Sequence, residues 1–149
     1  MAKPVTSSFG DVAILVGDGA TPTEAFTLLC GVTEKGISYS TETVETEVPD
    51  CANEDLPAFK EVDVKSFGIS LDVSGLWTKE EHEMLLQWQI TGAKKNAKVH
   101  YKKAASGDTE YVAAPAVLSN LNHQGSKGER FKASFNIVFA SAPTLTAAA

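Results

Sequence analysis

The chain has 149 residues, of which 43% are hydrophobic and 21% charged, and its 13 basic and 19 acidic residues give a formal net charge of −6. This composition is typical of a folded globular protein, and the length predicts one domain over residues 1–149. No apolar run approaches the roughly 20 residues that span a bilayer, residues 12–16 are too short for a signal-peptide core, and an acidic chain does not favour nucleic-acid binding.

The N-terminal part of the chain predicts an arm at residues 1–8 followed by three strands. Apolar and polar residues alternate between turn residues, which predicts strands at 11–17, 23–31 and 36–47. Cys30 and Cys51 are too few for a disulfide-based fold and are expected to be free thiols. A bridge between them would close a loop of about 20 residues and add on the order of 3 kcal/mol.

Residues 48–59 predict an acidic loop after the third strand. Its members include Val48, Pro49, Asp50, Asn53, Glu54, Asp55, Leu56, Pro57 and Phe59. A connection of about twelve residues inside a compact β domain is usually functional or disordered. From Glu34 to Asp63 the chain has nine acidic and two basic residues, so we expect a strongly negative surface here.

The next segment, 67–74, is a clear strand. Successive side chains of a strand face opposite sides, so Phe67, Ile69, Leu71 and Val73 share the inner face. The outer face then carries small polar residues, namely Gly68, Ser70, Asp72 and Ser74. An ordinary solvent face would carry more Lys and Glu, whereas a flat, small, polar face suits the wall of a pore.

A helix is expected at about residues 78–91. Thr78 and Glu81 have the spacing of a capping box, the first turn is rich in acids that complement the helix dipole, and Gly92 is a stop signal. Five lysines and no acid then follow, at Lys94, Lys95, Lys98, Lys102 and Lys103. These lysines are either a solvated face or a basic edge that meets the acidic loop of another subunit, in a head-to-tail contact.

The C-terminal part predicts strands at 97–103, 109–121 and 131–141 and a terminal arm at 142–149. The strand 131–141 repeats the earlier scheme, with Phe131, Phe135 and Phe139 on the inner face. The fold class is therefore mainly β, an antiparallel sandwich or barrel of about seven strands with one flanking helix.

No enzymatic motif is present in the sequence. His82, His100 and His123 have no metal-ligand spacing with one another or with a cysteine, and His82 is expected to be a solvated surface residue. Serines lie on strand faces rather than in a nucleophile turn, and no glycine pattern resembles a phosphate loop. We therefore expect neither catalysis, nor a metal, nor a cofactor.

The most specific motif is the run Val48-Pro49-Asp50-Cys51, an acidic stretch, and Leu56-Pro57-Ala58-Phe59. It follows a strand pair ending in Cys30-Gly31, and the small-residue strand 66–75 that comes after it leads directly into the helix. In this order of parts, over roughly residues 9–141, the chain resembles the tail tube (major tail) proteins of long-tailed bacteriophages.

The resemblance implies a structural virion protein with a β-sandwich flanked by one helix. Six copies would form a ring, and stacked rings would form the tail tube through which DNA is ejected into the host. The implied partners are further copies of the chain, a tape-measure protein, a tail terminator, and baseplate or distal tail proteins, without a membrane and without tight DNA binding. The protein would be made in the host cytoplasm and end in the virion tail.

The resemblance also suggests roles for particular residues. Candidates for the lumen are Glu42, Ser70, Asp72 and Ser74, since a negative or neutral lumen repels phosphate. The 48–59 loop is expected to reach an adjacent ring or subunit. Cys30 and Cys51 occupy matching positions, so that a bridge would pin the base of this loop.

Two other functions fit parts of the sequence. A secretion-system tube protein has the same fold and ring assembly, and a free-standing β-sandwich module would bind a sugar or another ligand through exposed aromatic residues. Trp77 and Trp88 lie at or in the helix, however, and the phenylalanines of the two clearest strands lie on the predicted inner face. The sequence therefore favours the tube protein.

Overall fold

The computed structural model describes residues 3–17, 24–29 and 31–149. A short 3₁₀ turn, η1 (Phe9–Asp11), precedes the strands and the single α-helix of this part of the chain. In chain order the elements are β1 (Val12–Gly17), β2 (Phe26–Leu28), β3 (Val32–Val48), β4 (Phe59–Leu76), α1 (Lys79–Thr91), β5 (Lys95–Tyr101), β6 (Thr109–Gln124), β7 (Lys132–Phe139) and β8 (Thr144–Ala147). The fold is mainly β with one helix, as the sequence predicts.

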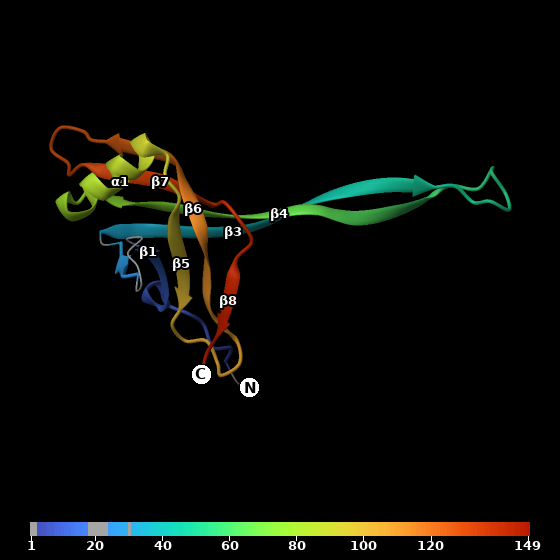
Figure 1. The fold of residues 1–149 in the computed structure, drawn as a ribbon, viewed down its shortest axis with the longest axis horizontal. Coiled ribbons are helices and arrows are strands. Elements are labelled where there is room, and N and C mark those ends of the chain that lie inside the picture. Colours follow the sequence, from blue (N-terminus) through green and yellow to red (C-terminus); the bar gives the residue numbers. More distant parts are fainter. Residues whose placement is uncertain (1–2, 18–23, 30) are drawn as a thin grey trace.

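The described strands form one antiparallel sheet in the order β2-β1-β5-β6-β7-β4-β3, with β8 as an additional partner of β6. β6 organises this sheet because it is long enough to pair with β5 along one edge and with β7 and β8 in succession along the other. Where β7 ends, the Ala140 N–H donates to the Pro115 carbonyl at 2.7 Å. The strand pairing thus continues past the break between β7 and β8 (Figure 1).

The core lies on the inner face of this sheet, and α1 contributes to it. Its largest fully buried side chains are Trp88 from α1, Leu71 from β4, Ile137 from β7 and Val99 from β5. Because these residues come from elements far apart in the sequence, their burial fixes the positions of the helix and the strands together.

The alternation predicted for the two clearest strands is confirmed within the core. Ile69, Leu71 and Val73 of β4 are buried, and so are Phe135, Ile137 and Phe139 of β7. The prediction was wrong for Phe67 and Phe131, which are largely exposed. Phe67 is on the core side of β4 but lies beyond Ile69, the last residue of that side that is buried. Phe131 precedes β7, and the centroid of its ring is 6.4 Å from that of the Trp77 ring.

The helix begins and ends where the sequence predicts. Thr78 is the N-cap, and Gly92 ends α1 in the left-handed conformation with φ 67°, its N–H donating to the Trp88 carbonyl at 3.1 Å. The predicted capping box was wrong, because the Thr78 side chain makes no hydrogen bond at the cap. It lines a small cavity between the end of β4 and α1 instead.

The predicted C-terminal arm also needs correction. Residues 144–147 form β8, since β6 extends past the end of β7 and its free edge pairs with them. In the N-terminal half, β2 is shorter than the predicted strand 23–31, of which residues 23 and 30 lie outside the described part.

Replacing Trp88 by alanine tests the position of the helix on the core. Trp88 is 1% exposed, so Trp88→Ala is expected to lower the free energy of unfolding by about 3–5 kcal/mol. Ile90 is on the same helix but 75% exposed, so Ile90→Ala should change stability by less than about 0.5 kcal/mol. Urea denaturation measures both, and equal effects would contradict the packing described here.

Candidate assembly surfaces

β3 and β4 continue as a two-stranded ribbon far beyond the body of the protein (Figure 1). They pair from Val32 with Gly75 to Val48 with Phe59. β7 pairs with β4 only over residues 70–76, so no other described strand supports the remainder. At roughly 3.3 Å per residue, this unsupported part of β4 is about 35 Å long. We call residues 40–67, including the turn at 49–58, the ribbon.

The ribbon buries almost nothing of itself. All of its residues except Asp50 are exposed. They include seven large apolar side chains, namely Val44, Val48, Leu56, Phe59, Val62, Val64 and Phe67. An isolated two-stranded hairpin is marginally stable in water, and exposed strand edges with apolar side chains are sites of association. The ribbon is therefore a candidate surface for contact with another chain.

The ribbon also carries the net charge of the chain. It contains eight acidic and two basic residues, so that eleven of each sign remain in the rest of the sequence. Lys60 pairs with Glu45 at 3.3 Å and Lys65 with Glu42 at 3.8 Å, but these ion pairs are exposed and contribute little stability. The strongly negative segment that the sequence predicts thus lies on one projecting element, the ribbon.

The turn at the tip is held by its own polar side chains. Asp50 Oδ1 accepts hydrogen bonds from the N–H groups of Ala52 at 2.8 Å and Asn53 at 3.3 Å, and Asn53 Oδ1 accepts from the Asp55 N–H at 3.1 Å. Such turns fix the backbone locally and leave the flanking apolar side chains in solvent. The predicted acidic loop is therefore the tip of a hairpin.

The hypothesis of a bridge between Cys30 and Cys51 gains no support. Cys51 is a free, exposed thiol at the tip of the ribbon. Cys30 lies outside the described residues, but its neighbour Gly31 precedes β3, so the full length of that strand separates Gly31 from the tip.

Side chains at the base of the ribbon connect it to the body. The hydroxyls of Tyr39 and Tyr101 share a hydrogen bond of 2.6 Å. Burial, and then the bond to Tyr101, raise the pKa of Tyr39 above its usual value. Lys35 Nζ donates to the carbonyls of Phe9 (3.2 Å) and Val12 and lies over the Phe9 ring, and burial lowers the pKa of this lysine. Because these contacts lie at the base, they leave the outer ribbon free.

The outer face of the sheet is small and polar across four strands. Strand pairing places Gly36, Asp72, Asn136 and Asn120 in one row, and Glu34, Ser74, Ser134 and Asn122 in the next. The Asn136 amide, oriented to satisfy both groups, donates to Asp72 Oδ1 at 2.9 Å, and the Ser74 hydroxyl donates to Glu34 at 3.3 Å. Three of the residues predicted to line a lumen, Ser70, Asp72 and Ser74, lie on this face, and Glu42 lies on the same side of the ribbon.

The five lysines at 94–103 do not form one surface. Lys94 and Lys95 are at the start of β5 and Lys102 and Lys103 follow its end, so the strand separates the two pairs. Lys98 lies over the rings of Phe26 at 3.9 Å and Tyr111 at 5.1 Å. Lys103 Nζ is 3.4 Å from Asp11, a carboxyl whose pKa is lowered by the hydrogen bond from the Ser8 N–H.

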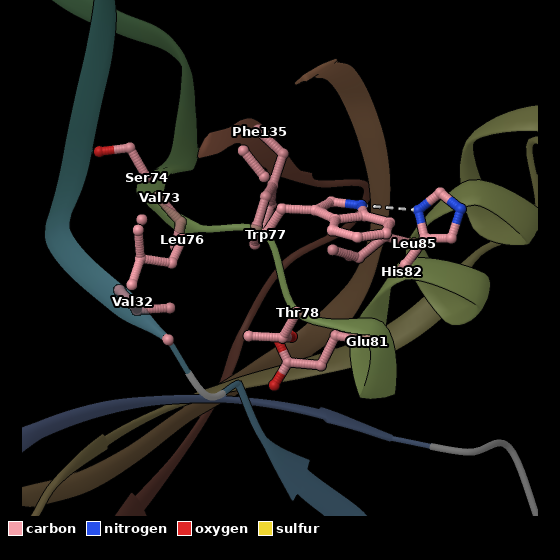
Figure 2. Close-up of a pocket in the computed structure, with 13 residues that line it drawn as sticks. Val32, Val73, Ser74, Leu76, Trp77, Thr78, Glu81, His82, Leu85 and Phe135 are labelled. Carbon is pink, nitrogen blue, oxygen red and sulfur yellow. Dashed lines mark hydrogen bonds between the residues drawn. The ribbon is translucent and has the colours of Figure 1, made fainter. Parts of the chain in front are cut away.

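His82 is not the solvated residue that the sequence predicts. Its Nδ1 accepts a hydrogen bond from Trp77 Nε1 at 2.9 Å (Figure 2). The centroid of its ring lies 5.4 Å from that of the His123 ring. His100 is 3.0 Å from Glu110 on a neighbouring strand. The contacts of His82 depend on how α1 packs beside the sheet, and the contact of His100 depends on the pairing of β5 with β6. No sequence spacing indicates either.

The cavity beside His82 is too small for a substrate. It measures about 20 Å³, room for about one water molecule, and lies between the end of β4 and the start of α1 (Figure 2). Among the described residues no three His, Cys, Asp or Glu side chains gather into a metal site. No helix in this part of the chain is long and apolar enough to cross a membrane.

Comparison with known proteins identifies the class. A family described as phage tail tube protein matches residues 6–145. Comparison with curated protein sequences gave no match.

Solved structures share the fold. A native gene transfer agent virion matches with a TM-score of 0.76 at 17% identity, over 95% of this chain and 100% of that chain. The tail of an empty gene transfer agent particle, with C6 symmetry, matches with a TM-score of 0.76 at 18% identity and the same coverage. The SPP1 tail tube matches with a TM-score of 0.63 at 12% identity, over 95% of this chain and 80% of that chain.

The family match over nearly the whole chain shows that this protein belongs to the phage tail tube protein family. It is a structural protein and not an enzyme. The mainly β fold with one helix predicted from the resemblance is confirmed by the similar structures, which come from a gene transfer agent virion, a gene transfer agent tail and the SPP1 tail tube.

Proposed function

We propose that six copies of this chain form a ring and that stacked rings make a tail tube through which DNA is ejected into the host. The ribbon carries this proposal, because it exposes free strand edges and apolar side chains that need a partner. The C6 symmetry of the gene transfer agent tail supports six as the number of copies.

In the proposed tube the small polar face lines the lumen. Its side chains are short, so they do not obstruct the channel, and Asp72 and Glu42 add negative charge that repels the phosphates of DNA. The genome therefore passes without tight binding. This role accounts for a sheet face that carries mostly Ser, Gly and Asn together with acidic residues.

The tip of the ribbon, at 48–59, makes the contact with an adjacent ring or subunit. Its acidic side chains would meet basic ones of the neighbour, for which the exposed Lys94, Lys102 and Lys103 are candidates. Such a contact is heterologous, so it can close into rings or continue as a stack. A tape-measure protein, a tail terminator and baseplate or distal tail proteins complete the assembly, and the chain is made in the host cytoplasm.

Electron microscopy of the purified chain tests assembly and the role of the tip together. We expect sixfold rings or hollow tubes from the full chain at high concentration. Replacing residues 49–58 by an Asn-Gly turn shortens the hairpin without breaking it, and this variant should fold but form no tubes. Changing Asp50 and Asp55 to Asn and Glu54 to Gln keeps the length and the accepting Oδ1 of residue 50, so it isolates the effect of charge. Normal tubes from the shortened variant would contradict the role of the tip.

Reversing a charge tests the lumen. Asp72→Lys places a cation where DNA would pass, so we expect slower DNA ejection from virions that carry this variant, with tails of normal length. Asp108→Lys makes the same charge change in the exposed turn before β6 and should leave ejection unchanged. Equal ejection rates for Asp72→Lys and the unmodified protein would show that this face is not the lumen.

A further inference from the structure

One strand of the ribbon contains an extra residue. Glu42 pairs with Ser66 and the next residue, Thr43, pairs with Val64, so Lys65 is a β-bulge without a pairing partner on β3. A bulge changes the alternation of the strand that carries it. The side of the ribbon on which residues 59–64 lie is therefore decided at Lys65.

The bulge places two valines on the same side as the core. Directly paired residues share a face, and Tyr39, paired with the buried Ile69, is on the same side as Thr41, Thr43 and Glu45. Thr43 pairs with Val64 and Glu45 pairs with Val62, so both valines lie on this side. Regular pairing without a bulge would instead put Lys65, Asp63 and Glu61 on this side.

The result is an apolar row that begins in the core and continues into solvent. Ile69 is buried, and after it Phe67, Val64 and Val62 are 64%, 65% and 58% exposed. At the start of the exposed part, Tyr39 and Phe67 border an apolar cleft with Pro143 and Leu145. We call Tyr39, Val62, Val64, Phe67 and Leu145 the apolar row. On the opposite side of the ribbon, the positions beside Val64 and Val62 carry three acidic residues and one large apolar residue. The acidic residues are Glu42, Asp63 and Glu61, and the apolar residue is Val44.

Charge decides what can cover this row. The ribbon has a net charge of −6 from eight acidic and two basic residues, so two ribbons repel each other. The rest of the chain has no net charge, and its surface can approach a ribbon without this repulsion. The occupant is therefore the body of a second copy rather than a second ribbon.

We propose that the bulge at Lys65 selects the face of the ribbon that binds the body of a second copy, and that the apolar row is that face. The inference rests on the proposed assembly into a tube. Beyond that assembly, the inference specifies which side of the ribbon is buried against the second copy and names Lys65 as the residue that sets this side.

Two matched substitutions test the face. Val62→Asp and Val44→Asp each place a new carboxylate opposite an existing one, Glu45 and Asp63 respectively, so their cost to the ribbon itself is similar. Burying the carboxylate at position 62 should raise the concentration at which tubes form by roughly tenfold or more. Val44→Asp should shift that concentration by less than about threefold.

Two changes that both remove the bulge test the register. Deleting Lys65 leaves Val64 paired with Thr43, so the valines stay on the core side and tubes should still form. Inserting a serine between Glu42 and Thr43 gives Lys65 a partner and turns Val62 and Val64 to the other side, so tubes should not form. Circular dichroism and the melting temperature confirm that the body is folded in each variant.

The outcomes separate this inference from the proposed function. If the unmodified chain forms neither rings nor tubes, the proposed function and the inference fall together. If it forms tubes and Val62→Asp assembles as readily as Val44→Asp, the apolar row is not the contact face, and the tube function stands. The serine insertion is expected not to assemble. If the Lys65 deletion also fails to assemble, the role of the bulge in setting the register is overturned.

Discussion

An unsupported β-ribbon is the constraint on which the rest of this structure depends. β3 and β4 leave the sheet after the pairing of β4 with β7 ends at Ser70, and the following residues have one partner strand and almost no buried side chains. Ordering a residue costs about 1–2 kcal/mol of conformational entropy, which hydrogen bonds exposed to water scarcely offset. The ribbon therefore needs a further surface to be a stable part of the protein, and in the proposed tube other copies would supply it.

The division of charge fits this dependence. Because the net charge is confined to the ribbon, the body of one copy can pack against the body of another without long-range repulsion. The same division opposes pairing between ribbons, the contact that free edges would otherwise favour. On the body, the small polar face and the buried core are opposite sides of the same strands, so one sheet provides both stability and a smooth surface.

Much of the body could be predicted from the sequence. The alternation of apolar and polar residues predicts that Leu71 and Ile137 are buried, and Thr78 and Gly92 mark the ends of the helix. Both patterns are local in the sequence, so they can be recognised without the structure. Contacts between distant segments have no such signal. The hydrogen bond from Trp77 to His82 and the packing of the Thr78 side chain depend on how α1 sits beside the sheet.

The ribbon was predictable only in part, for a physical reason. Its tip has turn residues that predict a loop, and the predicted strand 36–47 covers most of β3. Residues 59–66 lack the apolar alternation of a buried sheet, so the sequence does not predict that β4 extends beyond the segment 67–74. Phe67 was assigned to the interior because alternation reports the side of a strand and not the extent of the core. Lys65 is an ordinary residue in sequence, and only the pairing of Thr43 with Val64 reveals the bulge.

Hydrogen–deuterium exchange of the ribbon amides tests the central claim most directly. It should be measured in dilute protein and in the same protein after assembly. We predict rapid exchange at residues 40–48 and 59–67 in the dilute protein, slow exchange at 70–76, and strong protection of the ribbon after assembly. Ribbon amides that are equally protected in the dilute monomer would show that the ribbon is stable alone, which would contradict its dependence on neighbouring copies.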